Sequence, residues 1–155
     1  MLVGVAAISQ RCEDPADALE LSLFTLALER AAEDAGSRSL LARADRIFAP
    51  RGSWDHCDPC RFAAARFGAA KARTVVAEIG ILQTTLLARA AAAIASGEAD
   101  VVLVEGAEAR FRAQRAKLRG GVASQTTLPA APPDEVLRPQ GAILSGAELR
   151  AGLGH

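Results

Sequence analysis

Two cysteines stand three residues apart in Cys57-Asp58-Pro59-Cys60, where a helix is expected to begin. Unpaired backbone N–H groups at a helix N-terminus lower the pKa of a thiol, so this spacing permits a redox pair. The structural alternative is that Cys60 packs as a small apolar residue and Cys57 lies in a loop. A metal site would need further ligands, for which only His56 and Cys12 remain, and we expect no metal.

A second candidate is a run of cations without intervening acids. It consists of Arg110, Arg112, Arg115, Lys117 and Arg119. These side chains could contact the phosphates of a nucleotide-like cofactor, or they could form a solvated helix face, since no platform of aromatic residues accompanies them. Gly120 and Gly121 are typical of a helix stop rather than of a phosphate cradle. His155 is the last residue, and the sequence contains no Ser-His-Asp signature, P-loop or G-x-G-x-x-G motif.

Composition restricts the class of protein. The 155 residues include 18 Lys+Arg and 18 Asp+Glu, so the formal net charge is zero and a global basic footprint for nucleic acid is excluded. No apolar run reaches the ~20 residues of a membrane span. Residues 1–9 lack the basic start of a signal peptide, and three cysteines is an odd number. We therefore expect a cytoplasmic protein with reduced thiols.

Short apolar runs alternate with amphipathic segments, which predicts an α/β fold with a mostly parallel sheet. Strands are expected at 3–9, 46–49, 74–78 and 101–104. Helices are expected from Asp14 to Gly36, from Asp58 to Gly68, over 81–96 and over 107–119. The proline-rich residues 124–155 are predicted to form an extended loop with one short helix over 145–151.

One predicted helix is unusual in its composition. Between Ile81 and Ser96 the only charged residue is Arg89, and residues 90–93 are all alanine. A helix that is apolar on nearly every side is buried on nearly every side. We therefore expect this to be the most buried helix, with a further layer of structure on top of it.

The segment 88–109 reads ARAAAAIASGEADVVLVEGAEA. It resembles the thiolase superfamily, in which a central helix ends in A-x-x-I-x-S-G-x-A-D-V-V-L and a strand and a G-x-E turn follow. Here the pattern falls on Ala91, Ile94, Ser96-Gly97, Ala99–Leu103 and Gly106–Glu108. An N-terminal V-G-V run, a helix ending in E-D-A-G and a late GAELRAGLG stretch fit as well. The likeness is to thiolase-like acetyl-CoA acetyltransferases of the sterol-carrier-protein type and covers nearly the whole chain.

The resemblance implies a fold of two similar halves, each a five-stranded mixed sheet with a buried central helix between the sheets. Residues 1–123 would form the N-terminal half-domain, and 124–155 the start of a Pro-rich extended loop region. The strand at 74–78 would lie at the edge of the sheet and pair antiparallel with its twin in a dimer. The implied partner is a second copy or a separate chain that supplies the other half.

The resemblance also implies a chemistry. Thiolases transfer acyl groups to or from coenzyme A in lipid metabolism, through a cysteine thioester at the start of the first central helix. The family spacing puts that position at Gly80, so we assign no catalytic residue and expect no resident cofactor. The cofactor-binding residues are left open, and a coenzyme A thioester is the substrate that the resemblance implies. The expected function is an acyl-CoA acyltransferase, or a related acyl-CoA aldolase, that is inactive as this half alone. The alternative is a non-catalytic assembly subunit or remnant that completes a thiolase fold with another chain.

Overall fold

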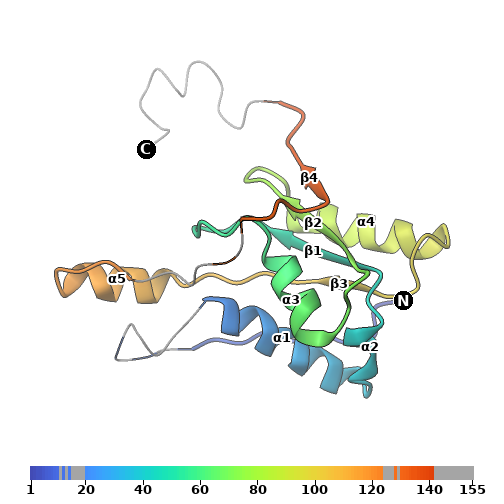
Figure 1. Cartoon of the computed structure of the whole chain (residues 1–155), viewed down its shortest axis with the longest axis horizontal. Coiled ribbons are helices and arrows are strands. Elements are labelled where there is room, and N and C mark those ends of the chain that lie inside the picture. Colours follow the sequence, from blue (N-terminus) through green and yellow to red (C-terminus); the bar gives the residue numbers. More distant parts are fainter. Residues whose placement is uncertain (11, 13, 15–19, 124–127, 129, 142–155) are drawn as a thin grey trace.

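The computed structural model describes residues 1–10, 12, 14, 20–123, 128 and 130–141. Its centre is a four-stranded sheet built from β1 (Arg46–Pro50), β2 (Arg73–Ala77), β3 (Val102–Val104) and β4 (Glu135–Leu137). The strand order is β3-β1-β2-β4, and every pair is parallel (Figure 1). The α/β class is thus confirmed, and the described sheet is parallel throughout rather than mixed.

The helices cover the sheet on two sides. α1 (Glu20–Asp34), α2 (Ser39–Ala42) and α3 (Pro59–Phe67) pack on one face, and α4 (Gln83–Ala95) lies on the other. α5 (Arg110–Leu118) extends away from the sheet at the left of Figure 1.

The two faces have separate cores. The α3 side buries Leu28, Ile47, Ala49, Cys60 and Val76, among others. The α4 side is smaller and is formed by Phe48, Val75, Ala77, Leu86 and Leu137. Side chains of neighbouring residues on a strand point to opposite faces, which explains why Ile47 and Phe48 belong to different cores.

Local sequence signals account for the ends of α3. The Asp58 carboxylate accepts a hydrogen bond from the Arg61 backbone N–H at 3.0 Å and so caps the helix, with Pro59 as its first residue. At the other end Gly68 takes a left-handed φ of 77°, which costs glycine little. The predicted helix from Asp58 to Gly68 is confirmed at both ends.

The strand predicted at residues 3–9 is wrong. These residues pair with no strand in the described structure and instead run along α1, where the Val5 N–H donates to the Asp34 carboxylate at 2.9 Å. Gly4 lies so close to α1 that an added Cβ would come within 2.1 Å of the Ala31 carbonyl oxygen. A contact with a helix therefore replaces the pairing that the apolar sequence suggested.

The strand predicted at 74–78 forms as β2, but its predicted position at the edge of the sheet is wrong. β2 pairs with β1 on one side and with β4 on the other. Thr74 and Asp134, 60 residues apart, hold β4 there, because the Thr74 N–H donates to the Asp134 carboxylate at 2.8 Å. With both edges occupied, β2 cannot pair with a twin. β4 also places a strand within residues 124–155, which were expected to form a loop, while the helix predicted over 145–151 lies outside the described residues.

The expectation that the helix over 81–96 is the most buried is wrong for this chain. Within α4 only Leu86 and Ala93 are buried. Leu86 and the half-buried Ala90 pack in the core on this side of the sheet, and the described residues place no further layer on the other side of the helix. That exposed side, called here the outer face of α4, consists of Thr84, Leu87, Ala88, Ala91, Ala92 and Ala95.

Candidate functional site

The two cysteines of the C-x-x-C sequence lie in different environments. Cys60 is 0% exposed in the first turn of α3, and its thiol contacts the Val75 carbonyl oxygen at 3.6 Å, whereas Cys57 is exposed. Burial raises the pKa of the Cys60 thiol well above its usual value, and the negative charges of Glu105 and Asp58 raise it further. This is the opposite of the lowered pKa that a reactive thiolate needs, and the structure favours the structural interpretation of Cys60.

Alkylation should therefore distinguish the two thiols. We expect iodoacetamide at pH 7.5 to modify Cys57 at least about 100-fold faster than Cys60 in the folded chain, because only thiolates in contact with solvent react. Peptide mapping after timed quenching measures both rates. The chain unfolded in urea, where both thiols should react at the same rate, serves as the reference. Equal rates for Cys57 and Cys60 in the folded chain would contradict the burial of Cys60.

The start of α4 is the position that the thiolase resemblance assigns to a nucleophile. Gly80 has a φ of 104°, in the left-handed region that side chains rarely adopt, so a cysteine there would be strained. α4 begins directly after Leu82, whose side chain cannot cap the helix by a hydrogen bond. The side chains of Ile79 and Leu82 are 63% and 67% exposed. The N-terminus of α4 is thus open and apolar, and it carries no thiol.

Cys60 cannot replace the missing nucleophile. It belongs to the core on the α3 side of the sheet, whereas Leu86 anchors α4 on the opposite side. A strand layer therefore separates the Cys60 thiol from the N-terminus of α4.

The basic run forms α5, as predicted, but its cations do not share one environment. Arg112 is only 4% exposed, whereas Arg110, Lys117 and Arg119 are exposed. The Arg115 guanidinium lies 5.9 Å from the centre of the Phe111 ring, a cation–π contact. The helix stops before Gly120, whose φ of 76° confirms its role as a helix stop.

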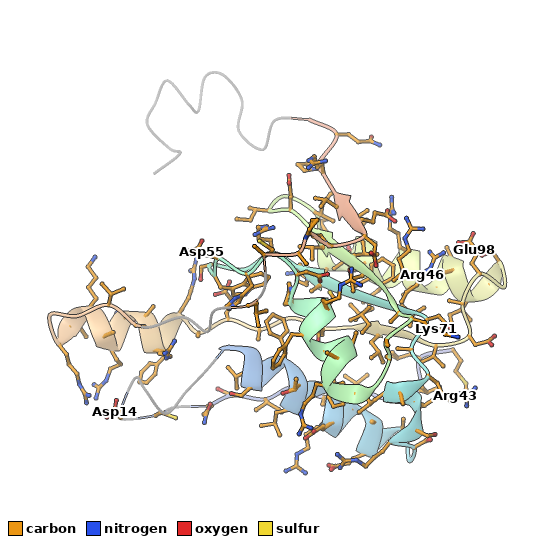
Figure 2. The ribbon with its side chains drawn as sticks, in the orientation of Figure 1. Asp14, Arg43, Arg46, Asp55, Lys71 and Glu98 are labelled. Carbon is orange, nitrogen blue, oxygen red and sulfur yellow. The ribbon has the colours of Figure 1, made fainter. Side chains whose placement is uncertain are left out.

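A groove separates α4 from the starts of β1 and β4. It is lined by Arg46, Phe48, Arg89, Ala92, Ala93, Ser96, Glu98 and Glu135. Its arginines are already paired: Arg46 lies 2.6 Å from Glu98 (both are labelled in Figure 2), and Arg89 lies 2.9 Å from Glu135. Because these charges compensate one another, the groove offers no excess positive charge to an anionic ligand.

Sequence reasoning missed a buried carboxyl group at the end of β3. Glu105 is 6% exposed, and both of its carboxylate oxygens are buried without a hydrogen-bond partner in the described structure. Burial and the nearby Asp58 carboxylate raise the pKa of Glu105 to about 8. A single acidic residue before a glycine is typical of an exposed turn. Only the position of Glu105 directly after an apolar strand could have suggested that it is buried.

A second polar cluster joins three elements near β2. The Thr74 hydroxyl donates to the Asp58 carboxylate at 2.7 Å and accepts from the Asp134 N–H at 3.1 Å. Arg61 pairs with both carboxylates, at 3.2 Å to Asp58 and 2.8 Å to Asp134. The hydrogen bond from the Thr74 N–H, followed by that from the Arg61 guanidinium, holds the pKa of Asp134 below its usual value. Every charge here has a partner, which is typical of a structural cluster.

One histidine and the remaining cysteine lie among the described residues. His56 is 3% exposed and stacks on Trp54, with ring centres 5.6 Å apart. Cys12 is half-buried, and His155 lies outside the described residues. No three His, Cys, Asp or Glu side chains are grouped to hold a metal ion in the part of the chain that the structure describes.

Fold and site together define an α/β protein with a parallel four-stranded sheet and one helix left open on its outer face. Comparison with protein-family models, with curated proteins and with solved structures finds no match in any of the three. Among the described residues, no helix is both long and apolar enough to cross a membrane.

Proposed function

We propose that this chain is a thiolase-like half-fold that works on coenzyme A thioesters only when a second half covers the outer face of α4. The function of the complete assembly is an acyl-CoA acyltransferase or a related acyl-CoA aldolase. The motif from Ala91 to Glu108 supports the family, and the exposure of α4 supports the missing half.

The outer face of α4 is the observation that carries the proposal. Helices that face water on one side carry charged or polar residues there, but this face presents Leu87, at 51% exposure, four alanines and a single polar residue, Thr84. Alanine allows a second helix to approach closely, since it adds little bulk between the two backbones. Such a surface fits a covering layer better than it fits solvent.

The catalytic groups are assigned to the covering half. Gly80 offers no side chain, and the Cys60 thiol is buried on the other side of the sheet. An acyl-enzyme thioester therefore has no site at the family position of this chain or on Cys60. The same two facts favour the alternative function, a non-catalytic subunit whose role is to complete the fold of another chain.

Co-expression tests the assembly and separates the two functions. The partner to be tested is the product of a neighbouring reading frame, where one carries the glycine-rich His and Cys motifs of a second thiolase half; the absence of such a frame favours the remnant or assembly subunit. We expect a stable complex in which amide exchange at Leu86–Ala93 slows by at least about tenfold relative to the chain alone. Turnover of acyl-CoA by that complex identifies a split enzyme, and a complex without turnover identifies the assembly subunit.

A matched pair of variants controls for non-specific effects. Ala88→Glu places a charge on the outer face of α4, whereas Ala113→Glu places the same charge on an exposed position of α5. We expect only Ala88→Glu to abolish the complex. Equal loss in both variants, or fast α4 exchange in an intact complex, would overturn the proposed covering layer.

The missing nucleophile gives a direct mass-spectrometric prediction. Incubation of the chain with acetyl-CoA should leave no acetyl adduct on the peptide that contains residues 78–84, because Gly80 cannot form a thioester. Intact-mass analysis followed by peptide mapping measures this. An adduct on Cys60 would contradict its burial, whereas an adduct on the exposed Cys57 would move the candidate site to the C-x-x-C loop.

A further inference from the structure

The described sheet ends in β3 on one side and in β4 on the other, and the two edges differ in their protection (Figure 1). An edge strand offers its N–H and C=O groups to any strand that approaches, and proteins block such edges with prolines and charges. β4 is blocked in this way, because Pro133 precedes it, Pro139 follows it and Glu135 is its first residue. β3 has the sequence Val-Leu-Val and no proline beside it, so its edge is unprotected.

The backbone of β3 points alternately to β1 and to the open edge. The Glu105 N–H donates to the Phe48 carbonyl oxygen on β1 at 2.9 Å, and the Val101 carbonyl oxygen accepts from the start of β1. The N–H and C=O groups of Val102 and Val104 therefore point away from β1. No residue that the structure describes forms a hydrogen bond with these outward groups.

The side chains of β3 are covered only in part. The middle residues of β1 and β2 are buried, whereas Val102, Leu103 and Val104 are all half-buried. Both valines pack in the core on the α4 side, and Leu103 packs in the core on the α3 side. A further strand at this edge would cover both faces of β3.

The side of α4 that faces this edge is uncharged. Arg89, the only charged residue of α4, lies 2.9 Å from Glu135 on β4, so it extends toward the opposite edge of the sheet. Leu87, Ala91 and Ile94, spaced by four and three residues, lie on the other side of the helix. Because α4 also contacts β3, apolar surface continues from the strand edge onto the helix.

A second copy of this chain is complementary to the edge. When two β3 strands run antiparallel about a two-fold axis through Leu103, Val102 of each copy stands opposite Val104 of the other. These are the residues whose backbone groups point outward, so each such pair exchanges both of its N–H and C=O hydrogen bonds. The axis also brings the uncharged sides of the two α4 helices toward each other.

We propose that this chain forms a two-fold dimer through β3, in which the two four-stranded sheets join into one continuous sheet. The strand edge and the adjoining side of α4 bury on the order of 500 Å² per copy, and about 1,000 Å² in total is the lower limit for a specific interface. The dimer goes beyond the proposed function, since it requires no second half.

Proline substitutions at the two edges test the dimer in the whole chain. Val102→Pro removes an outward N–H from β3, and Val136→Pro makes the same change on β4, where the neighbouring Leu137 carbonyl oxygen accepts from the Glu78 N–H of the segment after β2. By sedimentation equilibrium we expect the dimer Kd to rise at least about twentyfold in Val102→Pro and less than about threefold in Val136→Pro. Far-UV circular dichroism checks that both variants are folded.

A crosslink tests the register directly. Leu103 lies on the axis, where the Cα atoms of the two copies would be about 4.5 Å apart, within the range of a disulfide. The variants carry Cys12→Ser and Cys57→Ser, so that Cys60 is the only native thiol and is buried. Mild oxidation should convert at least about half of Leu103→Cys, and less than about a tenth of the β4 control Val136→Cys, to a covalent dimer. If Val102→Pro fails to fold, this comparison decides.

Three outcomes would overturn the β3 dimer. They are a parent that stays monomeric at 100 μM (~1.6 mg/ml for a chain of 16.1 kDa), equal weakening by the two prolines, and a dimer in which Leu103→Cys forms no crosslink. The complex with a second half is tested separately, through Ala88→Glu on the outer face of α4. The β3 dimer can therefore fail while the covering layer stands, and the reverse.

Discussion

The chain purified alone is expected to self-associate, and Ala91→Glu is expected to weaken that association at least tenfold. The outer face of α4, together with Ile79 and Leu82, leaves an apolar patch that is on the order of 400 Å², near the upper limit for soluble monomers. At ~25 cal/mol per Å², its burial contributes up to about 10 kcal/mol, comparable to the net stability of a domain. A charge in the middle of the patch would have to be buried without a partner.

Light scattering and a dye that reports exposed apolar surface measure this prediction. We expect the parent to scatter as a dimer or larger species at micromolar concentration, or to bind the dye strongly. Ala113→Glu, which adds the same charge on α5, serves as the control and should behave as the parent. If the parent is a compact monomer that does not bind the dye, the chain buries its apolar surface without a partner, and the half-fold proposal fails.

The second large effect, on the free energy of unfolding, is expected at Thr74, which contacts both carboxylates of the polar cluster. Thr74→Val keeps the shape of a 0% exposed side chain but removes the hydroxyl that donates to Asp58 and accepts from the Asp134 N–H. A buried carboxylate that loses a donor costs more than an average hydrogen bond, so we expect a loss of about 3 kcal/mol in the free energy of unfolding. For a chain of this length that lowers Tm by about 10 °C.

Thr74→Ser is the matched control for this prediction. It keeps the hydroxyl and removes one methyl group, which costs about 1 kcal/mol. Urea unfolding followed by circular dichroism gives both values. Equal losses in Thr74→Val and Thr74→Ser would mean that the methyl group, rather than the hydrogen bonds, stabilises this position.

The sequence predicted helices and strands well where the residues that determine them lie within the element itself. The Asp58 cap and the Gly68 stop lie within α3 itself, and the strands at 46–50 and 73–77 follow their apolar, β-branched runs. The strand predicted at 3–9 failed because apolar character alone does not decide whether a segment pairs with a strand or packs on a helix.

The rest of the fold depends on contacts between distant residues. β4 lies in a proline-rich segment with little periodicity, and it joins the sheet through Thr74 and Asp134, 60 residues apart. The strand order, and with it the internal position of β2, follows from that contact. Glu105 is likewise an acid that is buried near Asp58 at the start of α3, a neighbour that no spacing within its own strand encodes.

The long separation between β2 and β4 also sets the order in which the chain folds. Closing a loop of 60 residues costs more entropy than closing the shorter loop between β1 and β2, so we expect the β1–β2 pair to form before β4 docks and the folding nucleus to form without β4. Interactions absent from the transition state change the unfolding rate rather than the folding rate. Asp134→Ala should therefore accelerate unfolding in stopped-flow experiments and leave the refolding rate nearly unchanged, which makes the β4 contact a determinant of how long the native chain survives.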